Sequence, residues 1–64
     1  MTTLQRAMLT AKVVVWRQHA ANDDPLSPIW DAIEDAEAVL AGRHAAPDIV
    51  VPVLLNLDSE GRRV

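Results

Sequence analysis

Apolar and polar residues alternate with the period of an α-helix through the first third of the chain. On a helical wheel, the apolar residues between positions 2 and 21 fall into two groups that face in roughly opposite directions. One group is Leu4, Ala7, Met8, Ala11, Val14 and Val15, and the other is Leu9, Val13, Trp16 and Ala20. Thr2 and Gln5 have the spacing of a capping box, in which each side chain satisfies an unpaired backbone N–H at the start of a helix. We therefore expect a helix over about 3–21 that is covered on two sides.

A second amphipathic helix is predicted over 28–41, after the turn sequence NDDPLSP. Ser27 suits the N-cap and Pro28 the first helical position, where its missing N–H would have been unpaired in any case. Gly42 supplies the left-handed residue that ends many helices. The apolar residues of this segment share one arc of the wheel: Ile29, Ala32, Ile33, Ala36, Val39 and Leu40. Because the connection between the two helices is short, we expect them to form an antiparallel hairpin.

The C-terminal segment carries the apolar run DIVVPVLLNL, which spans residues 48–57. With strand geometry both of its faces are apolar, as in a strand that is covered on both sides. Pro52 cannot donate a hydrogen bond to a neighbouring strand, so a central position in a sheet is disfavoured. We therefore expect residues 49–57 to form an extended edge strand, or a strap across the helices, and residues 58–64 to fray.

The stretch KVVVWR leaves a second interpretation open, because valine and tryptophan favour β-strands. In that alternative the chain is a small α/β protein, with strands near 12–17 and 49–55 flanking the helix at 28–41. The helical prediction is favoured, since the capping box agrees with the continuous periodicity that begins at Leu4. The predicted fold is mainly α: a single domain over 1–64, made of a helical hairpin followed by an apolar C-terminal strap.

Length and composition limit how such a domain can be stabilised. A chain of 64 residues buries only about 60% of the surface that it exposes when unfolded. Small domains compensate with disulfides, metals or oligomerisation, and the absence of cysteine excludes disulfides. Half of the residues are hydrophobic, which is too many for a disordered chain. Self-association or a protein partner is therefore the expected remedy.

No membrane-spanning or targeting segment is expected. Arg6 and Lys12 interrupt the first apolar stretch, and no apolar run reaches the length of about 20 residues that a bilayer requires. We therefore expect a cytoplasmic protein. The net charge of −3 and the scattered placement of Arg6, Lys12 and Arg17 argue against a nucleic-acid-binding surface.

The sequence contains no glycine-rich phosphate loop and no G-x-S-x-G or H-E-x-x-H motif. We predict no catalytic, cofactor-binding or metal-binding residue. His19 and His44 would lie at opposite ends of the hairpin, and we interpret both as surface residues near helix C-termini. Asp31 and Asp35 are like charges one helical turn apart, so we expect a basic group of the first helix, or of a partner, to compensate them.

A count of apolar surfaces leads to the functional hypothesis. The hairpin uses one face of each helix, and the C-terminal run covers the second face of the first helix with one of its own two sides. One apolar side of the run then stays exposed, and such a patch usually marks an interaction site. We therefore expect a non-enzymatic protein–protein interaction module, such as an accessory subunit, an adaptor or a small inhibitor encoded by a phage or mobile element. It would act on a protein partner or on itself.

The residues predicted to bind that partner are Trp16, Val13, Trp30, Val51, Val53, Leu55, Asp31 and Asp35. The alternative hypothesis is a small DNA-binding regulator or antitoxin-type protein. Its basic stripe on the first helix would touch DNA only in a dimer.

Overall fold

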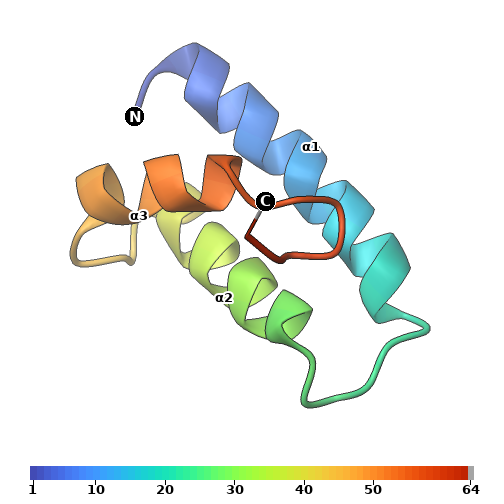
Figure 1. Cartoon of the computed structure of the whole chain (residues 1–64). Helices are drawn as coiled ribbons and strands as arrows, with labels where there is room; N and C mark the ends of the chain where they lie inside the picture. Colours follow the sequence, from blue (N-terminus) through green and yellow to red (C-terminus); the bar gives the residue numbers. More distant parts are fainter. Residues whose placement is uncertain (64) are drawn as a thin grey trace.

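The computed structural model describes residues 1–63, and these residues form three helices (Figure 1). Helix α1 spans Thr3–Ala20, α2 spans Pro28–Leu40 and α3 spans Pro47–Leu55. Within the described residues, the only β-type pairing is an isolated antiparallel bridge between Leu57 and Arg63. The prediction of a mainly α fold is confirmed.

Helix α1 begins at the predicted capping box. The Thr2 hydroxyl accepts a hydrogen bond from the Gln5 backbone N–H at 3.0 Å, and Gln5 Oε1 accepts one from the Thr2 backbone N–H at 2.9 Å. The helix continues through residues 12–17, so the α/β alternative with a strand there is wrong. The physical reason is burial: residues three apart share a face of a helix but lie on opposite faces of a strand. Only the helix buries both Val13 and Trp16 in one core.

Helix α2 also begins and ends close to its predicted positions. The Ser27 hydroxyl accepts from the Ile29 backbone N–H at 3.4 Å, and Pro28 occupies the first helical position. Gly42 follows the helix with a φ of 73°, the left-handed conformation that closes many helices. The buried residues of α2 are Ile29, Ala32, Ile33, Ala36 and Val39, which are five of the six predicted from the wheel.

The prediction of an extended strand or strap over 49–57 is wrong, because residues 47–55 form helix α3. Pro47 occupies a first-turn position of this helix, where proline is well tolerated. Val51 and Leu54 are both buried, and their spacing of three puts them on one side of a helix but on opposite sides of a strand. Pro52 lies on the exposed side, where water can bind the Asp48 carbonyl that lacks its helical donor.

Replacing Pro52 by alanine is expected to stabilise the protein by about 1–2 kcal/mol. The substitution restores a backbone N–H that can donate inside α3, and a proline in a helix interior costs about 3 kcal/mol. Part of this gain is lost, because alanine gives the unfolded chain more conformational entropy than proline does. Urea unfolding followed by far-ultraviolet circular dichroism measures the change. An extended segment would gain no helical hydrogen bond, so unchanged or lower stability in the Pro52→Ala chain would contradict the helical assignment.

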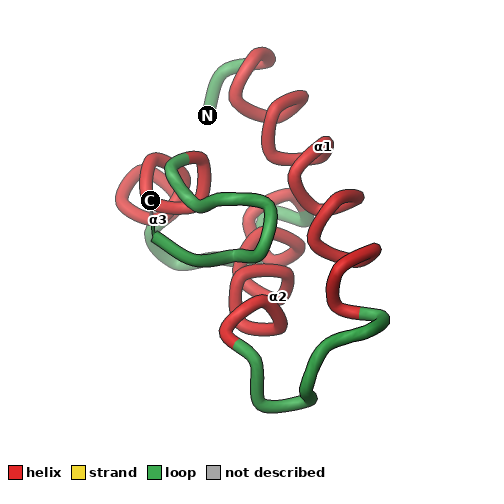
Figure 2. The backbone as a smooth tube through the Cα atoms, turned by 45° about the vertical axis from the view of Figure 1, so that its right-hand side comes forward, coloured by secondary structure: helices red, strands yellow, loops and turns green. Residues whose placement is uncertain are grey.

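The three helices enclose one core. Helices α1 and α2 lie side by side and run in opposite directions, and α3 crosses them at the end where α1 begins (Figures 1 and 2). Each pair of helices is in contact. The buried hydrophobic residues that form this core are Leu9, Val13, Trp16, Ala20, Ile29, Ala32, Ile33, Ala36, Val39, Val51 and Leu54.

The segment predicted to fray, 58–64, forms a closed turn over the residues that the structure describes. The Asp58 backbone N–H donates to the Arg62 carbonyl at 2.8 Å. Asp58 Oδ1 accepts from the backbone N–H groups of Glu60 at 2.8 Å and of Arg62 at 3.0 Å. We call residues 57–63 the C-terminal turn; it lies over the junction of α1 and α2 (Figure 1).

Two hydrogen bonds and one close packing contact attach the C-terminal turn to the helices. Trp16 Nε1 donates to the Asp58 carbonyl at 2.8 Å, and Lys12 Nζ donates to the Leu57 carbonyl at 2.7 Å. Gly61 is buried against the start of α2, where a Cβ at residue 61 would lie 2.9 Å from Ile29 Cα. The turn is therefore part of the folded unit.

The Asp58 carboxylate should make folding sensitive to acid. The backbone N–H groups of Arg62 and Glu60 donate to it and hold its pKa below the ordinary value of 3.8. Because the folded-state pKa is lowered, the stability it contributes is fully present above pH 3.8 and is lost as the pH falls through the folded-state pKa.

We expect the Asp58→Asn chain, which keeps an acceptor oxygen but cannot titrate, to lose less stability than the wild type below that pH. Thermal unfolding across the acid range measures this. An equal fall in melting temperature with decreasing pH in the two proteins would contradict the role of Asp58.

Candidate protein interface

Helix α1 has one buried face and one exposed apolar face. The buried residues are Leu9, Val13, Trp16 and Ala20, which we call the core face. On the opposite side of the helix all six apolar residues are exposed. They form what we call the open face: Leu4, Ala7, Met8, Ala11, Val14 and Val15. The exposed fractions of the largest of these side chains are 69% for Leu4, 52% for Val14 and 44% for Met8.

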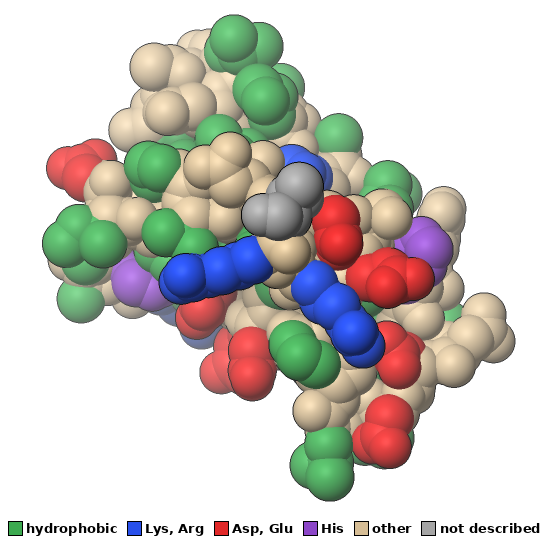
Figure 3. Space-filling view, viewed as in Figure 1, with side chains coloured by type: hydrophobic (Ala, Val, Ile, Leu, Met, Phe, Trp, Pro, Cys, Tyr) green, Lys and Arg blue, Asp and Glu red, His purple; other side chains and the backbone are tan. Residues whose placement is uncertain are grey.

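The open face follows from how the other elements pack. Helices α2 and α3 and the C-terminal turn all lie against the core face, because Trp16 and its neighbours are buried among them. No further element remains in residues 1–63 to cover the other side of α1. In the space-filling view, hydrophobic side chains accordingly reach the surface along α1 (Figure 3).

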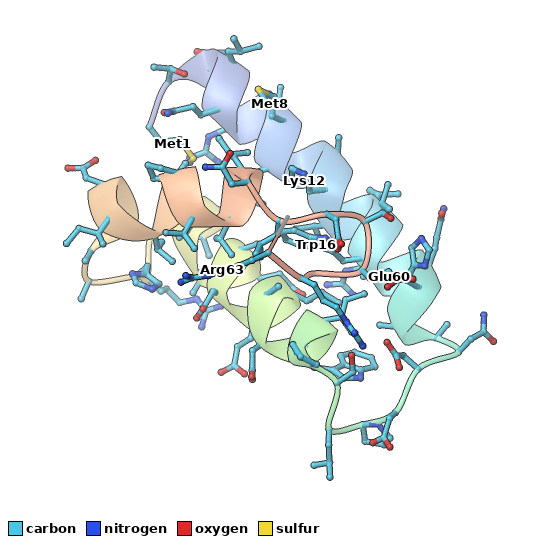
Figure 4. The ribbon with its side chains drawn as sticks, viewed as in Figure 1. Met1, Met8, Lys12, Trp16, Glu60 and Arg63 are labelled. Carbon is cyan, nitrogen blue, oxygen red and sulfur yellow. The ribbon has the colours of Figure 1, made fainter. Side chains whose placement is uncertain are left out.

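The basic side chains of α1 bind other parts of the same chain. Arg6 Nη1 donates to the Leu40 carbonyl at the end of α2, at 3.2 Å. Lys12 extends from α1 to the Leu57 carbonyl beyond α3, beside Trp16 (Figure 4). Cations are favoured at the C-terminal ends of helices, where unpaired carbonyls carry partial negative charge. These contacts attach α1 to its neighbours.

The third basic group of α1, Arg17, pairs with Glu37 of α2. We expected a basic residue to compensate Asp31 and Asp35, but both carboxylates are exposed and the described residues place no ion pair on them. Beside the Arg17–Glu37 pair, a shallow depression of about 300 Å³ contains the exposed part of Trp30 and also Arg43. Its lining combines charged and apolar side chains, and it is separate from the open face.

A second shallow groove, of about 200 Å³, lies beside the open face. It is lined by Ala11, Lys12, Val15, Trp16 and Ser59. Ala11 and Val15 belong to the open face, whereas Ser59 belongs to the C-terminal turn. The turn therefore forms one wall of a groove whose floor continues into the open face.

The structure separates the predicted partner-binding residues into two groups. Trp16, Val13 and Val51 are buried in the core, with Trp16 0% exposed, so a partner cannot contact them while the chain is folded. The others lie at or near the surface on α2 and α3. They are Trp30, Asp31 and Asp35 on α2, and Val53 and Leu55 on α3. The structure does not bring these five together with the open face of α1.

The residues of the open face were missed as partner-binding residues. The signal was present in the sequence, because a helix with two apolar faces needs two covering elements. We assigned the second cover to the C-terminal run. As a short helix, that run instead packs on the same side of α1 as α2 does, and only Ile49 and Val53 remain as large exposed apolar residues on α3.

The histidines do not form a shared site in residues 1–63. His19 is exposed near the end of α1, and His44 Nδ1 accepts from the Ala46 backbone N–H at 3.0 Å in the connection before α3. Among the described residues, no three His, Asp or Glu side chains lie close enough together to hold a metal ion. Neither α1, the longest helix in this part of the chain, nor the shorter α2 and α3 has the length and apolar character needed to cross a bilayer.

Comparisons with protein-family models, with curated proteins and with solved structures found no match to this chain. The function must therefore be inferred from the chemistry of its surfaces, and the open face of α1 is the most unusual of them.

Proposed function

We propose that this chain is a non-enzymatic protein–protein interaction module whose binding surface is the open face of α1. The observation that supports this most strongly is the pairing of two apolar faces on one helix, of which residues 1–63 bury only one. An accessory subunit, an adaptor and a small inhibitor would all act in this way, through a bound partner or through self-association.

Two physical arguments support the open face as the binding surface. First, the core is closed without it, so its apolar side chains contribute little to folding of the single chain. Second, a contiguous apolar patch on a small soluble domain is unfavourable unless something covers it, and such patches mark interaction sites. Met8 at its centre adds an adaptable side chain of the kind that is common at binding surfaces.

The apolar C-terminal segment contributes a smaller part of the proposed binding surface. On α3, Ile49 and Val53 are exposed one helical turn apart and form a second, narrower apolar patch. The outer face of α2 adds Asp31 and Asp35 near Trp30, which is 42% exposed. Either surface would extend a contact rather than provide its centre.

The alternative of a DNA-binding regulator or antitoxin-type protein has less support. It would rely on the basic residues of α1 to contact phosphates. Arg6, Lys12 and Arg17 each bind a group of the same chain, and releasing them would weaken the attachment of α1 to its neighbours.

Photo-crosslinking from methionine tests the proposed function. The chain has two methionines, Met1 and Met8, and both are exposed. Replacing both by photo-methionine during expression in the source organism places one reactive group on the open face, at residue 8, and a second at residue 1, which stays the same in the control below. We expect discrete adducts after irradiation. In the control, Met8→Leu is combined with Leu26→Met, which moves the label to the exposed connection between α1 and α2.

Loss of the adducts in this control would support the proposal. Equal adducts from both chains, or none from either, would contradict it.

A further inference from the structure

The open face has the residue spacing of a helix that pairs with another helix. Leu4, Met8, Ala11, Val15 and Gln18 follow one another at intervals of four, three, four and three. This is the seam of a coiled coil, in which residues about 3.5 apart face the partner helix along its length. All five positions are exposed. The surface is therefore suited to an α-helix rather than to a strand or a small molecule.

The sizes of the seam residues favour an antiparallel copy of the same helix. In an antiparallel pair related by a two-fold axis, Leu4 lies opposite Val15 and Met8 lies opposite Ala11, since each pair of numbers has the same sum. Each larger side chain then meets a smaller one, which is how close packing is achieved across an interface. A parallel pair would place Met8 against Met8 and Ala11 against Ala11, leaving one crowded layer and one gap.

The charges of α1 are compatible with this self-pairing. The helix contains no Asp or Glu, so two copies form no charge pair of either sign along the seam. The ammonium of Lys12, at the margin of the seam, is bound to the Leu57 carbonyl of its own chain. Arg6 and Arg17 are likewise directed to α2. Because these cations are bound within their own chain, they do not favour an acidic partner at the seam. The dipoles of two antiparallel helices also attract one another.

We propose that the open face is covered by a second copy of this chain, with the two α1 helices packed antiparallel about a two-fold axis. This inference rests on the proposed function, because it names the partner of the same surface. The contact is small. A helix of 18 residues is about 27 Å long and 10–12 Å wide, so its footprint is roughly 300 Å² per copy, against about 800 Å² in a standard stable interface. We expect a reversible dimer with a micromolar or weaker dissociation constant.

Sedimentation velocity over about a hundred-fold range of concentration tests for the dimer. We expect the wild type to shift from one 7.0 kDa chain to two as the concentration rises. Met8→Glu places a charge at the centre of the seam and should weaken the dimer by about a hundred-fold or more. The control is Ile49→Glu, which alters an apolar site on α3 that is more exposed than Met8 (74% against 44%) and should dimerise like the wild type.

A wild type that stays monomeric throughout would overturn the inference. A dimer that Ile49→Glu abolishes and Met8→Glu leaves intact would do the same.

The orientation can be tested by disulfide trapping, because the chain has no cysteine of its own. Leu4→Cys and Val15→Cys alter exposed positions and should leave the fold intact. Under mild oxidation, a mixture of the two chains should form the mixed disulfide much faster than either chain forms a disulfide with itself. Rapid self-linking of the Leu4→Cys chain alone would indicate a parallel pair and overturn the antiparallel arrangement.

The photo-crosslinking experiment separates failure of this inference from failure of the proposed function. Met8-dependent adducts of twice the chain's own mass support the second copy. Met8-dependent adducts of another mass, from a chain that sediments as a monomer, overturn the second copy while the interaction module stands. Absence of any Met8-dependent adduct, together with a monomer at every concentration, overturns both.

Discussion

Replacing Trp16 by alanine is expected to remove a large part of the free energy of unfolding. The indole is fully buried in the core beneath the C-terminal turn, and its N–H donates to the Asp58 carbonyl. Truncating a buried tryptophan to alanine costs about 3–5 kcal/mol. A domain of this length has a total stability of about 3–10 kcal/mol, so a loss of that size removes much of it.

The second tryptophan provides the matched control. Trp30 is 42% exposed on α2, and Trp30→Ala should lower the free energy of unfolding by no more than about 1 kcal/mol. Far-ultraviolet circular dichroism with urea titration measures both variants. Trp16→Phe refines the test, because it keeps most of the packing and removes the indole hydrogen bond, for an expected loss of about 1 kcal/mol. Equal destabilisation by Trp16→Ala and Trp30→Ala would contradict the placement of Trp16 in the core.

Gly61→Ala is expected to destabilise the protein by about 2 kcal/mol or more. Gly61 has a φ of 75°, a left-handed conformation that costs other residues about 1–2 kcal/mol. An added Cβ would also lie 2.9 Å from Ile29 Cα, a backbone atom that cannot move aside without shifting α2. The C-terminal turn would therefore have to lift from α1 and α2, which would break its hydrogen bond with Trp16.

Gly42→Ala separates the two causes of this effect. Gly42 has a nearly identical φ of 73°, but a Cβ there would meet no atom within 4 Å. Its substitution should therefore show the conformational cost alone, about 1–2 kcal/mol. Urea unfolding gives both values, and the excess at Gly61 measures the close contact with Ile29. A Gly61→Ala chain no less stable than Gly42→Ala would show that the C-terminal turn is not packed as described.

The first two helices could be predicted because their signals are local. The capping box of Thr2 and Gln5 fixes one boundary, and Ser27, Pro28 and Gly42 fix two more. The third helix could not be predicted in the same way. A short run that is apolar at nearly every position fits a covered strand and a buried helix equally well. In the sequence, Pro52 favours an extended segment, although a proline on the solvent side of a short helix removes only one hydrogen bond.

The open face illustrates a different limit of sequence reasoning. The wheel divided α1 correctly into its two apolar groups, but periodicity carries no information on which group faces the core. That choice depends on tertiary packing, because the face with Trp16 is the one that α2, α3 and the C-terminal turn can all reach. The larger indole makes its burial the more favourable choice. Trp16 and Val13 were therefore predicted as partner-binding residues, whereas the exposed residues on the opposite side, Leu4 and Met8 among them, were missed.

Helix α1 is open on one apolar face in the single chain, and we propose that a second copy covers this face. Thiol labelling of two adjacent positions tests this claim most directly. Met8→Cys places a thiol on the open face and Leu9→Cys places one on the core face, in a chain with no other cysteine. At low concentration we expect the thiol at position 8 to react about as fast as a free thiol. The thiol at position 9 should react only through unfolding.

As the concentration rises, the thiol at position 8 should become protected, whereas the thiol at position 9 should react slowly at every concentration. Protection of both positions at the lowest concentration would show that the chain covers the open face itself. Equally fast labelling of position 8 at every concentration would show that no second copy covers it. Either result would contradict the account.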